Sequence, residues 1–355
     1  MFRRAHARSG LFSVAAFIVS IVLLANAGTA SAQQPVEVKV GVLGALGDAT
    51  MYLAEKEGYF KAEGLKVDLI SFKSAAQLVA PLGTGQVDVA AGVIAAGLIN
   101  LAARGVNLKV VSDRASMSPG HGYMRFLVRK DLVDSGKYKT YADLKGMKVG
   151  SQSKGGAAES TLNELLKLGG LKFEDVDLVY LGHPELATAL GSKAIDASFV
   201  TEPYATMALK QGTAVQIVNG DQIYPNQALG VLMYGGPFMK DKPEAAVGFM
   251  KAFLRACRLF NSAYDSNGKM IPGPTAEKVK VAFKSFMDLK DDRLIETMVP
   301  YGCNADGKMN VAGLKKDYEF FKQRGLLQGD VKIEQLIDMS FAERAVKELA
   351  KSARE

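Results

Sequence analysis

The strongest constraint on the fold is an internal repeat, in which one strand–helix–strand pattern occurs twice. The first copy covers residues 38–72. It has alternating valines, a glycine-rich turn, an amphipathic helical stretch that ends at Gly64, and a second alternating stretch. The second copy begins at Met147–Ser151, and corresponding positions of the two copies lie 106 to 109 residues apart. A helix between two such strands predicts a βαβ unit with parallel strands and a right-handed crossover. Two copies of this unit therefore predict two similar α/β lobes.

The repeat extends beyond the first unit, because residues 82–90 (LGTGQVDVA) correspond to residues 190–198 (LGSKAIDAS). No third copy follows Asn219. After a strand expected at Gln227–Tyr234, the remaining residues show helical periodicity and are expected to cover the sheets. The helices are expected at Lys242–Tyr264, Thr275–Met287, Asp291–Met298, Val311–Arg324 and Ile333–Glu348.

The first 32 residues have the pattern of a secretory signal peptide. Arg3, Arg4 and Arg8 precede an apolar run over residues 11–24, and the stretch ends in Ala30-Ser31-Ala32. This run is shorter than the roughly 20 residues that a membrane-spanning helix needs. We therefore predict cleavage after about Ala32 and a mature protein that is periplasmic and not inserted in a membrane.

Charge and motif content argue against several functional classes. The chain has a net charge of +7, and without the three leader arginines it has 41 basic residues against 37 acidic ones. No run of Lys and Arg accompanies this small excess, so nucleic-acid binding has little support. P-loop and dinucleotide-binding patterns are absent near the glycine-rich turn at residues 154–156, and we expect no cofactor.

The two cysteines and three histidines supply little reactive chemistry. Cys257 and Cys303 have no metal-ligand cluster around them, so no metal site is expected. They could form a disulfide in an oxidising compartment or remain two thiols, and the sequence leaves both open. His6 lies in the leader, and no nucleophile elbow or H-E-x-x-H motif accompanies His121 or His183. We expect a protein that is not an enzyme.

Several segments of the sequence resemble the periplasmic substrate-binding proteins of ABC importers, in the group that binds sulfonates, taurine, nitrate and thiamine precursors. The similar segments are Tyr52–Leu65 (YLAEKEGYFKAEGL), Gly85–Asp88, Ala142–Gly146, Glu202-Pro203 and Ser340–Arg344. The resemblance implies a type II periplasmic-binding-protein fold. In this fold each of two lobes is a mixed, mostly parallel sheet flanked by helices, and the ligand lies in the cleft between the lobes. It also implies a monomer that delivers its ligand to a membrane permease.

We predict that lobe one comprises residues 34–121 and 227–355, and that lobe two comprises residues 122–226. The lobes would close by a hinge motion at Gly120–Gly122 and Asn219–Asn226.

The ligand site is expected where the strands end, because open α/β sheets bind ligands beyond the carboxyl ends of their strands. Lobe one would contribute residues after its first and third strands, with Arg114 as a further cation, and lobe two would contribute a glycine-rich turn and a strand end. Glu202 could instead serve only to support a helix start. The predicted site residues are Leu46, Gly47, Asp48, Ala49, Ala91, Gly92, Val93, Arg114, Ser153, Lys154, Gly155, Gly156, Glu202 and Tyr204.

The predicted ligand is a small organic anion, sulfonate-like or carboxylate-like. Its charged end would meet Lys154 and the helix start at Gly155–Ala157, since helix N-termini attract anions. The apolar segment 91–96, which offers no arginine, suits an organic ligand. Asp48 and Glu202 oppose an anion, which leaves two alternatives. One is a binder of a pyrimidine-like or thiamine-precursor-like heterocycle, and the other is an enzyme of thiamine-precursor synthesis with the same fold. The sequence does not separate uptake from sensing.

Overall fold

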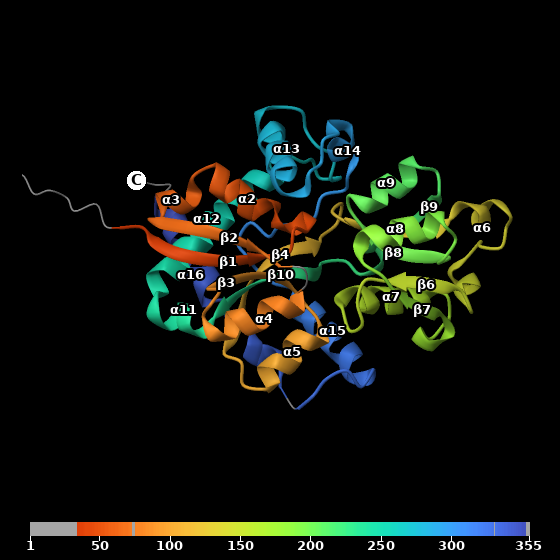
Figure 1. Cartoon of the computed structure of the whole chain (residues 1–355), viewed down its shortest axis with the longest axis horizontal. Coiled ribbons are helices and arrows are strands. Elements are labelled where there is room, and N and C mark those ends of the chain that lie inside the picture. Colours follow the sequence, from red (N-terminus) through yellow and green to blue (C-terminus); the bar gives the residue numbers. More distant parts are fainter. Residues whose placement is uncertain (1–33, 73–74, 330, 353–355) are drawn as a thin grey trace, which may run out of the picture. The chain divides into compact units, whose positions relative to one another are not determined.

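The computed structural model describes residues 34–72, 75–329 and 331–352. The predicted signal peptide lies outside these residues. Within them, no helix has both the length and the apolar character needed to cross a membrane. Two five-stranded sheets form the framework (Figure 1).

The first sheet has the strand order β2-β1-β3-β10-β4. Its inner strand β1 pairs in parallel with β2 and β3, and β10 runs antiparallel between β3 and β4. The strands are β1 (Val36–Val42), β2 (Leu65–Ser71), β3 (Val89–Val93), β4 (Leu108–Met117) and β10 (Gln227–Gly235).

The second sheet has the order β7-β6-β8-β5-β9 and the same pattern of directions. Its strand β6 pairs in parallel with β7 and β8, and β5 runs antiparallel between β8 and β9. The strands are β5 (Met124–Arg129), β6 (Lys148–Ser151), β7 (Asp177–Tyr180), β8 (Ala197–Thr201) and β9 (Ala214–Asn219). The predicted fold class, two mixed and mostly parallel α/β sheets, is confirmed.

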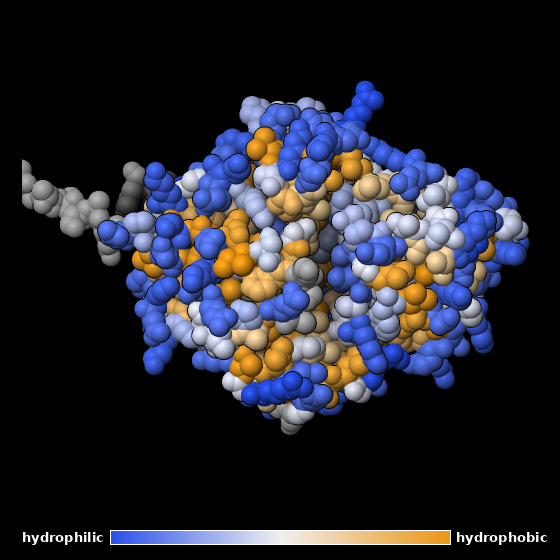
Figure 2. All heavy atoms as spheres, in the orientation of Figure 1, coloured by the Kyte–Doolittle hydropathy of each residue, from blue (hydrophilic) through white to orange (hydrophobic). Residues whose placement is uncertain are grey.

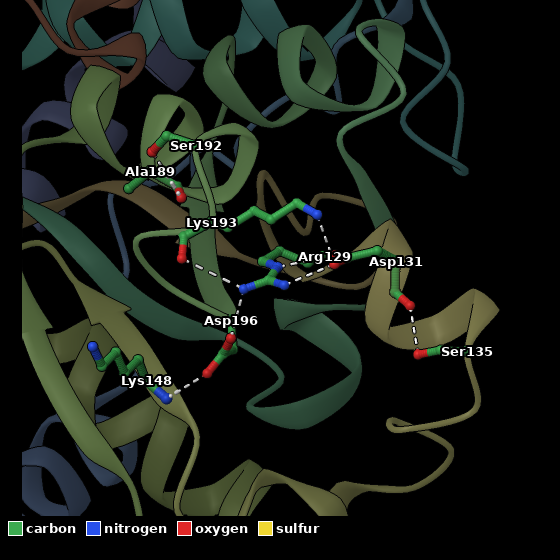
Figure 3. A network of polar contacts seen from close by, with 8 residues as sticks. All are labelled: Arg129, Asp131, Ser135, Lys148, Ala189, Ser192, Lys193 and Asp196. Atoms are coloured by element: carbon green, nitrogen blue, oxygen red, sulfur yellow. Dashed lines mark hydrogen bonds and ion pairs between the residues drawn. The ribbon is translucent and has the colours of Figure 1, made fainter.

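The repeat extends to individual hydrogen bonds. In the first sheet, the backbone N–H of Lys39 donates to Asp88 Oδ2 over 2.8 Å. In the second, the N–H of Lys148 donates to Asp196 Oδ2 over 2.9 Å. Figure 3 shows that Asp196 also binds the Arg129 guanidinium, so one carboxylate ties together the starts of β6 and β8 and the end of β5. Asp88 and Asp196 are 108 residues apart, which is the period seen in the sequence.

Helices cover the first sheet on both sides. Figure 1 shows α4 and α5 on one side and α2 and α13 on the other. The helices that accompany this sheet are η1 (Leu46–Asp48), α2 (Ala49–Lys56), α3 (Tyr59–Ala62), α4 (Ala75–Thr84), α5 (Ala96–Ala103), α11 (Gly236–Asp241), α12 (Pro243–Asn261), α13 (Pro274–Met287), α14 (Asp292–Thr297), α15 (Val311–Gln323), η4 (Ile333–Leu336) and α16 (Ser340–Ser352).

The second sheet has its own, shorter set of helices. They are α6 (Lys130–Asp134), η2 (Tyr141–Leu144), α7 (Ala157–Leu168), η3 (Phe173–Asp175), α8 (His183–Gly191), α9 (Tyr204–Lys210) and α10 (Gly220–Ile223).

The single helix expected at Ile333–Glu348 is wrong, because the chain breaks between η4 and α16. There Ile337 forms a bridge to Val110 of β4, and the N–H of Asp338 donates to the Val110 carbonyl over 2.9 Å. These bonds to the edge strand replace the helical ones. Asp338 then accepts from the N–H of Ser340 and helps to start α16.

Cys257 of α12 and Cys303 form a disulfide, with their Cα atoms 5.5 Å apart. The sequence alone leaves this pairing open. The bond holds the loop after α14 against the long, buried helix α12.

Two chain segments connect the sheets, one between β4 and β5 and one between β9 and β10. They lie side by side, because the N–H of Gly120 donates to Asp221 Oδ2 over 2.9 Å. A Cβ at Gly122 would lie 2.1 Å from Asp221 Oδ1. The division into lobes at 121/122 and 226/227, and a hinge in these segments, remain our proposal.

Candidate ligand-binding site

The segments that follow β3 and β6 meet across the two sheets. The N–H of Ala96 donates to the Gly155 carbonyl over 2.9 Å, and the N–H of Ala157 donates to the Ile94 carbonyl over 3.3 Å. Ala95 and Gly156 form an antiparallel bridge. Figure 2 shows a narrow groove on one face between the elements of the two sheets, with hydrophobic residues on both sides of it. The structure therefore brings two of the predicted site segments, one from each sheet, into direct contact.

Asp48 and Arg114, both predicted to face the ligand, bind each other in the interior. Their side chains are 0% and 2% exposed, and Arg114 Nη1 lies 2.7 Å from Asp48 Oδ1. Asp48 Oδ2 also accepts from the N–H groups of Leu43 and Ala45, each over 3.0 Å. Burial raises the pKa of Asp48, and the Arg114 guanidinium and these N–H groups oppose that rise. The pair is a support beneath the site, and its two charges cancel.

Arg114 also explains one of the glycines predicted at the site, Gly47. Its Nη2 donates to the Gly92 carbonyl over 3.0 Å, which ties β4 to the end of β3. A Cβ on Gly47 would lie 2.8 Å from Arg114 Nη1. Gly47 therefore leaves room for a buried guanidinium.

Glu202 is neutralised in the same way. It is 2% exposed, and its Oε1 lies 2.7 Å from Arg125 Nη2. Its Oε2 accepts from the N–H of Thr206 near the start of α9. Glu202 therefore supports the start of a helix, as the alternative interpretation expects, and also forms an ion pair with Arg125. It also accepts from the N–H of Val299, which follows α14. Burial raises the pKa of Glu202, with Arg125 as the main opposing influence.

The amides at the start of α7 are already used within the protein. The N–H of Gly155 donates to Glu159 Oε2 over 2.8 Å, that of Gly156 donates to the Ser153 carbonyl, and that of Ala157 donates to Ile94. Glu159 is fully buried and accepts a further bond from the Tyr180 hydroxyl over 2.6 Å. The prediction that the charged end of the ligand meets the start of α7 is therefore wrong, because the Glu159 carboxylate already occupies this position and an anion would have to displace it.

The remaining predicted residues divide by exposure. Ser153 and Lys154 are exposed, and the Lys154 ammonium has no hydrogen-bond or ion-pair partner in the described part of the chain. Val93 and Tyr204 are half-buried, whereas Leu46, Ala49 and Ala91 are buried. Lys154 is thus the one free cation among the predicted site residues.

Three groups near the second-sheet strand ends are not among the predicted site residues. His183 Nδ1 lies 3.0 Å from Thr201 Oγ1, and burial lowers the pKa of His183 to about 4, so its ring is neutral at pH 7. Ser151 ends β6, is 5% exposed, and its hydroxyl has no partner among the described residues. Arg125 stands inside an apolar strand, MRFLVR, and a charge in that position was a signal of a buried partner.

Residues 31–270 match the model of the NMT1-like family. The chain belongs to this family. Among curated relatives, it is 30% identical over 224 residues to the 4-amino-5-hydroxymethyl-2-methylpyrimidine phosphate synthase of Aspergillus parasiticus, covering 59% of this chain and 61% of that protein. It is also 30% identical over 131 residues to a putative aliphatic sulfonates-binding protein of Escherichia coli K12, covering 37% of this chain and 40% of the relative. Both matches span less than two thirds of the relative.

Among solved structures, the periplasmic nitrate-binding protein NrtA from Synechocystis PCC 6803 superposes with a TM-score of 0.71 at 13% identity. The superposition covers 89% of each chain. The fold is therefore that of a type II periplasmic binding protein. The family's relatives include both binding proteins and synthases.

Proposed function

We propose that the protein is an extracytoplasmic solute-binding protein that captures a small organic anion and delivers it to the permease of an ABC importer. Its family and its type II fold support a binding role. The observation that carries the choice of an anion is the internal pairing of Asp48 with Arg114 and of Glu202 with Arg125. The two carboxylates predicted at the site are each paired with an arginine, and the one unpaired charge among the predicted site residues is the Lys154 ammonium.

The anion contact in this proposal is Lys154 together with Ser153, and no longer the start of α7. The three amides there donate to protein acceptors, and the Glu159 carboxylate would repel a second negative charge. The apolar part of the ligand would lie against Val93 and Tyr204.

A pyrimidine-like heterocycle is the second candidate ligand. Ser151 offers a buried hydroxyl that has no partner among the described residues, and the neutral His183 offers a ring nitrogen near the strand ends. A synthase of the thiamine-precursor type is similar to this chain. An enzyme using this site would need a cofactor-anchoring lysine or an activated histidine. Lys154 is exposed and His183 is engaged with Thr201.

Calorimetric titration tests the proposal. Purified protein is titrated with alkanesulfonates, small carboxylates and pyrimidines. Lys154→Ala is compared with Lys137→Ala, which changes an exposed lysine in the segment between α6 and η2. A charge-assisted contact contributes about 1.5–3 kcal/mol. Because Lys154 is exposed, we expect the lower end, about a tenfold loss of affinity for the anion in Lys154→Ala, and no change in Lys137→Ala.

Unchanged affinity in Lys154→Ala would refute the anion contact, and a clear preference for pyrimidines would favour the second candidate. Conversion of any bound compound into a product would refute the binding-protein role.

A further inference from the structure

A cavity with a volume of about 590 Å³ lies beside the two connecting segments, apart from the candidate ligand-binding site. None of the residues predicted for the ligand site lines it. Its walls are the β4 edge with Asp113, the connecting segments with His121 and Asn226, and the loop between α14 and α15 with Asn304 and Lys308. This volume is within the range of about 300–1,000 Å³ that small-molecule sites occupy.

Asp113 is the central feature of this cavity. It is 1% exposed, and its Oδ2 accepts from Ser116 Oγ and from the N–H of Asn304, each over 3.2 Å. Its Oδ1 is buried and has no hydrogen-bond partner among the described residues. Native proteins rarely leave a buried carboxylate oxygen unpaired, because it loses the hydrogen bonds that water supplied.

The two other charged or titratable side chains in the wall define what could pair with it. Burial lowers the pKa of His121, which favours its neutral ring, and its Nδ1 has no partner among the described residues. Lys308 is exposed, and no partner of its ammonium is found within the described ranges. Among the described residues, the cavity therefore presents one unpaired carboxylate oxygen inside, Asp113 Oδ1, and one unpaired ammonium at its rim.

We propose that this cavity is a second binding site, for a small zwitterion of the amino-acid type. The protonated amine of the ligand donates to Asp113 Oδ1, and its carboxylate faces the Lys308 ammonium. A simple amine would satisfy Asp113 but would be repelled by Lys308, and a simple acid would be repelled by Asp113. Neither would bind as well as a molecule that carries both charges.

The arrangement favours a ligand over a purely structural role for Asp113. Burial raises the pKa of Asp113 to about 7, against the opposing effect of its hydrogen bonds from Asn304 and Ser116. A bound ammonium would supply the missing opposite charge. Arg114, the next residue along β4, lowers the pKa of Asp113 only from a distance, because its guanidinium binds Asp48 and the Gly92 carbonyl.

The test is calorimetric titration of the purified protein with glycine, alanine and serine, compared with ethanolamine and acetate. Asp113→Asn keeps the shape of the side chain and removes its charge. The matched control is Asp306→Asn, which makes the same change at a residue of the loop between α14 and α15 that does not line the cavity. We expect saturable binding of at least one amino acid, weakened tenfold or more by Asp113→Asn and unchanged by Asp306→Asn.

Lys308→Gln provides an independent measurement, because an exposed lysine can be replaced without disturbing the fold. It should weaken amino-acid binding several-fold while ethanolamine binding stays equal or improves. Lys154→Ala should leave amino-acid binding unchanged, which separates this site from the proposed anion site. The proposal is overturned if no amino acid saturates below about 10 mM, or if affinity survives both Asp113→Asn and Lys308→Gln.

Discussion

Removing the Asp48 carboxylate should destabilise the protein far more than removing an exposed carboxylate. In Asp48→Ala, the Arg114 guanidinium loses its 2.7 Å partner while remaining 2% exposed. Breaking a buried ion pair from one side costs about 3–5 kcal/mol, because the other charge stays in a poorly solvating interior. The N–H groups of Leu43 and Ala45 lose their acceptor as well. We expect a loss of at least about 3 kcal/mol, which is a large part of a typical total of about 5–15 kcal/mol.

The assay is urea unfolding at pH 7, followed by circular dichroism. Glu37→Gln is the control, because Glu37 pairs with Lys66 with both side chains 68% exposed, and its loss should leave the unfolding midpoint unchanged. In Asp48→Ala/Arg114→Met, no buried charge is left unpaired, so stability should recover in part. The interpretation of this pair as a buried support is wrong if the free energy of unfolding of Asp48→Ala lies within about 1 kcal/mol of the wild-type value. It is also wrong if the loss in the double variant equals the sum of the losses in Asp48→Ala and Arg114→Met.

Three further perturbations have defined outcomes. Replacing both Cys257 and Cys303 by Ala removes a cross-link between positions 46 residues apart. The chain-entropy relation predicts a loss of about 4 kcal/mol in the free energy of unfolding, which would be measured as a lower urea midpoint. An unchanged midpoint would contradict this prediction. Burial raises the pKa of Asp317 to about 7, so the stability that this group contributes below its unfolded pKa of about 4 is lost as pH rises through 7. The melting temperature of Asp317→Asn minus that of the wild type should therefore grow from pH 5 to pH 8. A difference that stays constant over this range would argue against the shifted pKa. Gly122→Ala places a Cβ against Asp221 and should cost about 1–3 kcal/mol, whereas Gly97→Ala, where nothing lies within 4 Å, should not destabilise; equal melting temperatures for the two variants would refute the steric argument.

The sequence by itself determined the two sheets. The alternation of valines at residues 38–42, the glycine stops and the second copy about 108 residues later depend on neighbours along the chain. The period of such a pattern reflects the geometry of a single strand or helix, so it predicts that strand or helix without knowledge of the rest of the fold. The same holds for Asp88 and Asp196, which occupy equivalent positions in the two copies.

The tertiary structure alone decided the charge of the site. Asp48 and Arg114 are 66 residues apart, and Glu202 and Arg125 are 77 apart, so no local period links either pair. Whether these side chains face a ligand or each other depends on which strands become neighbours and in which register. The sequence showed two carboxylates and an arginine near the strand ends and therefore predicted a charged lining. In the folded structure these side chains are buried, and each carboxylate is paired with an arginine, because a charge shielded from water is stable only beside an opposite charge.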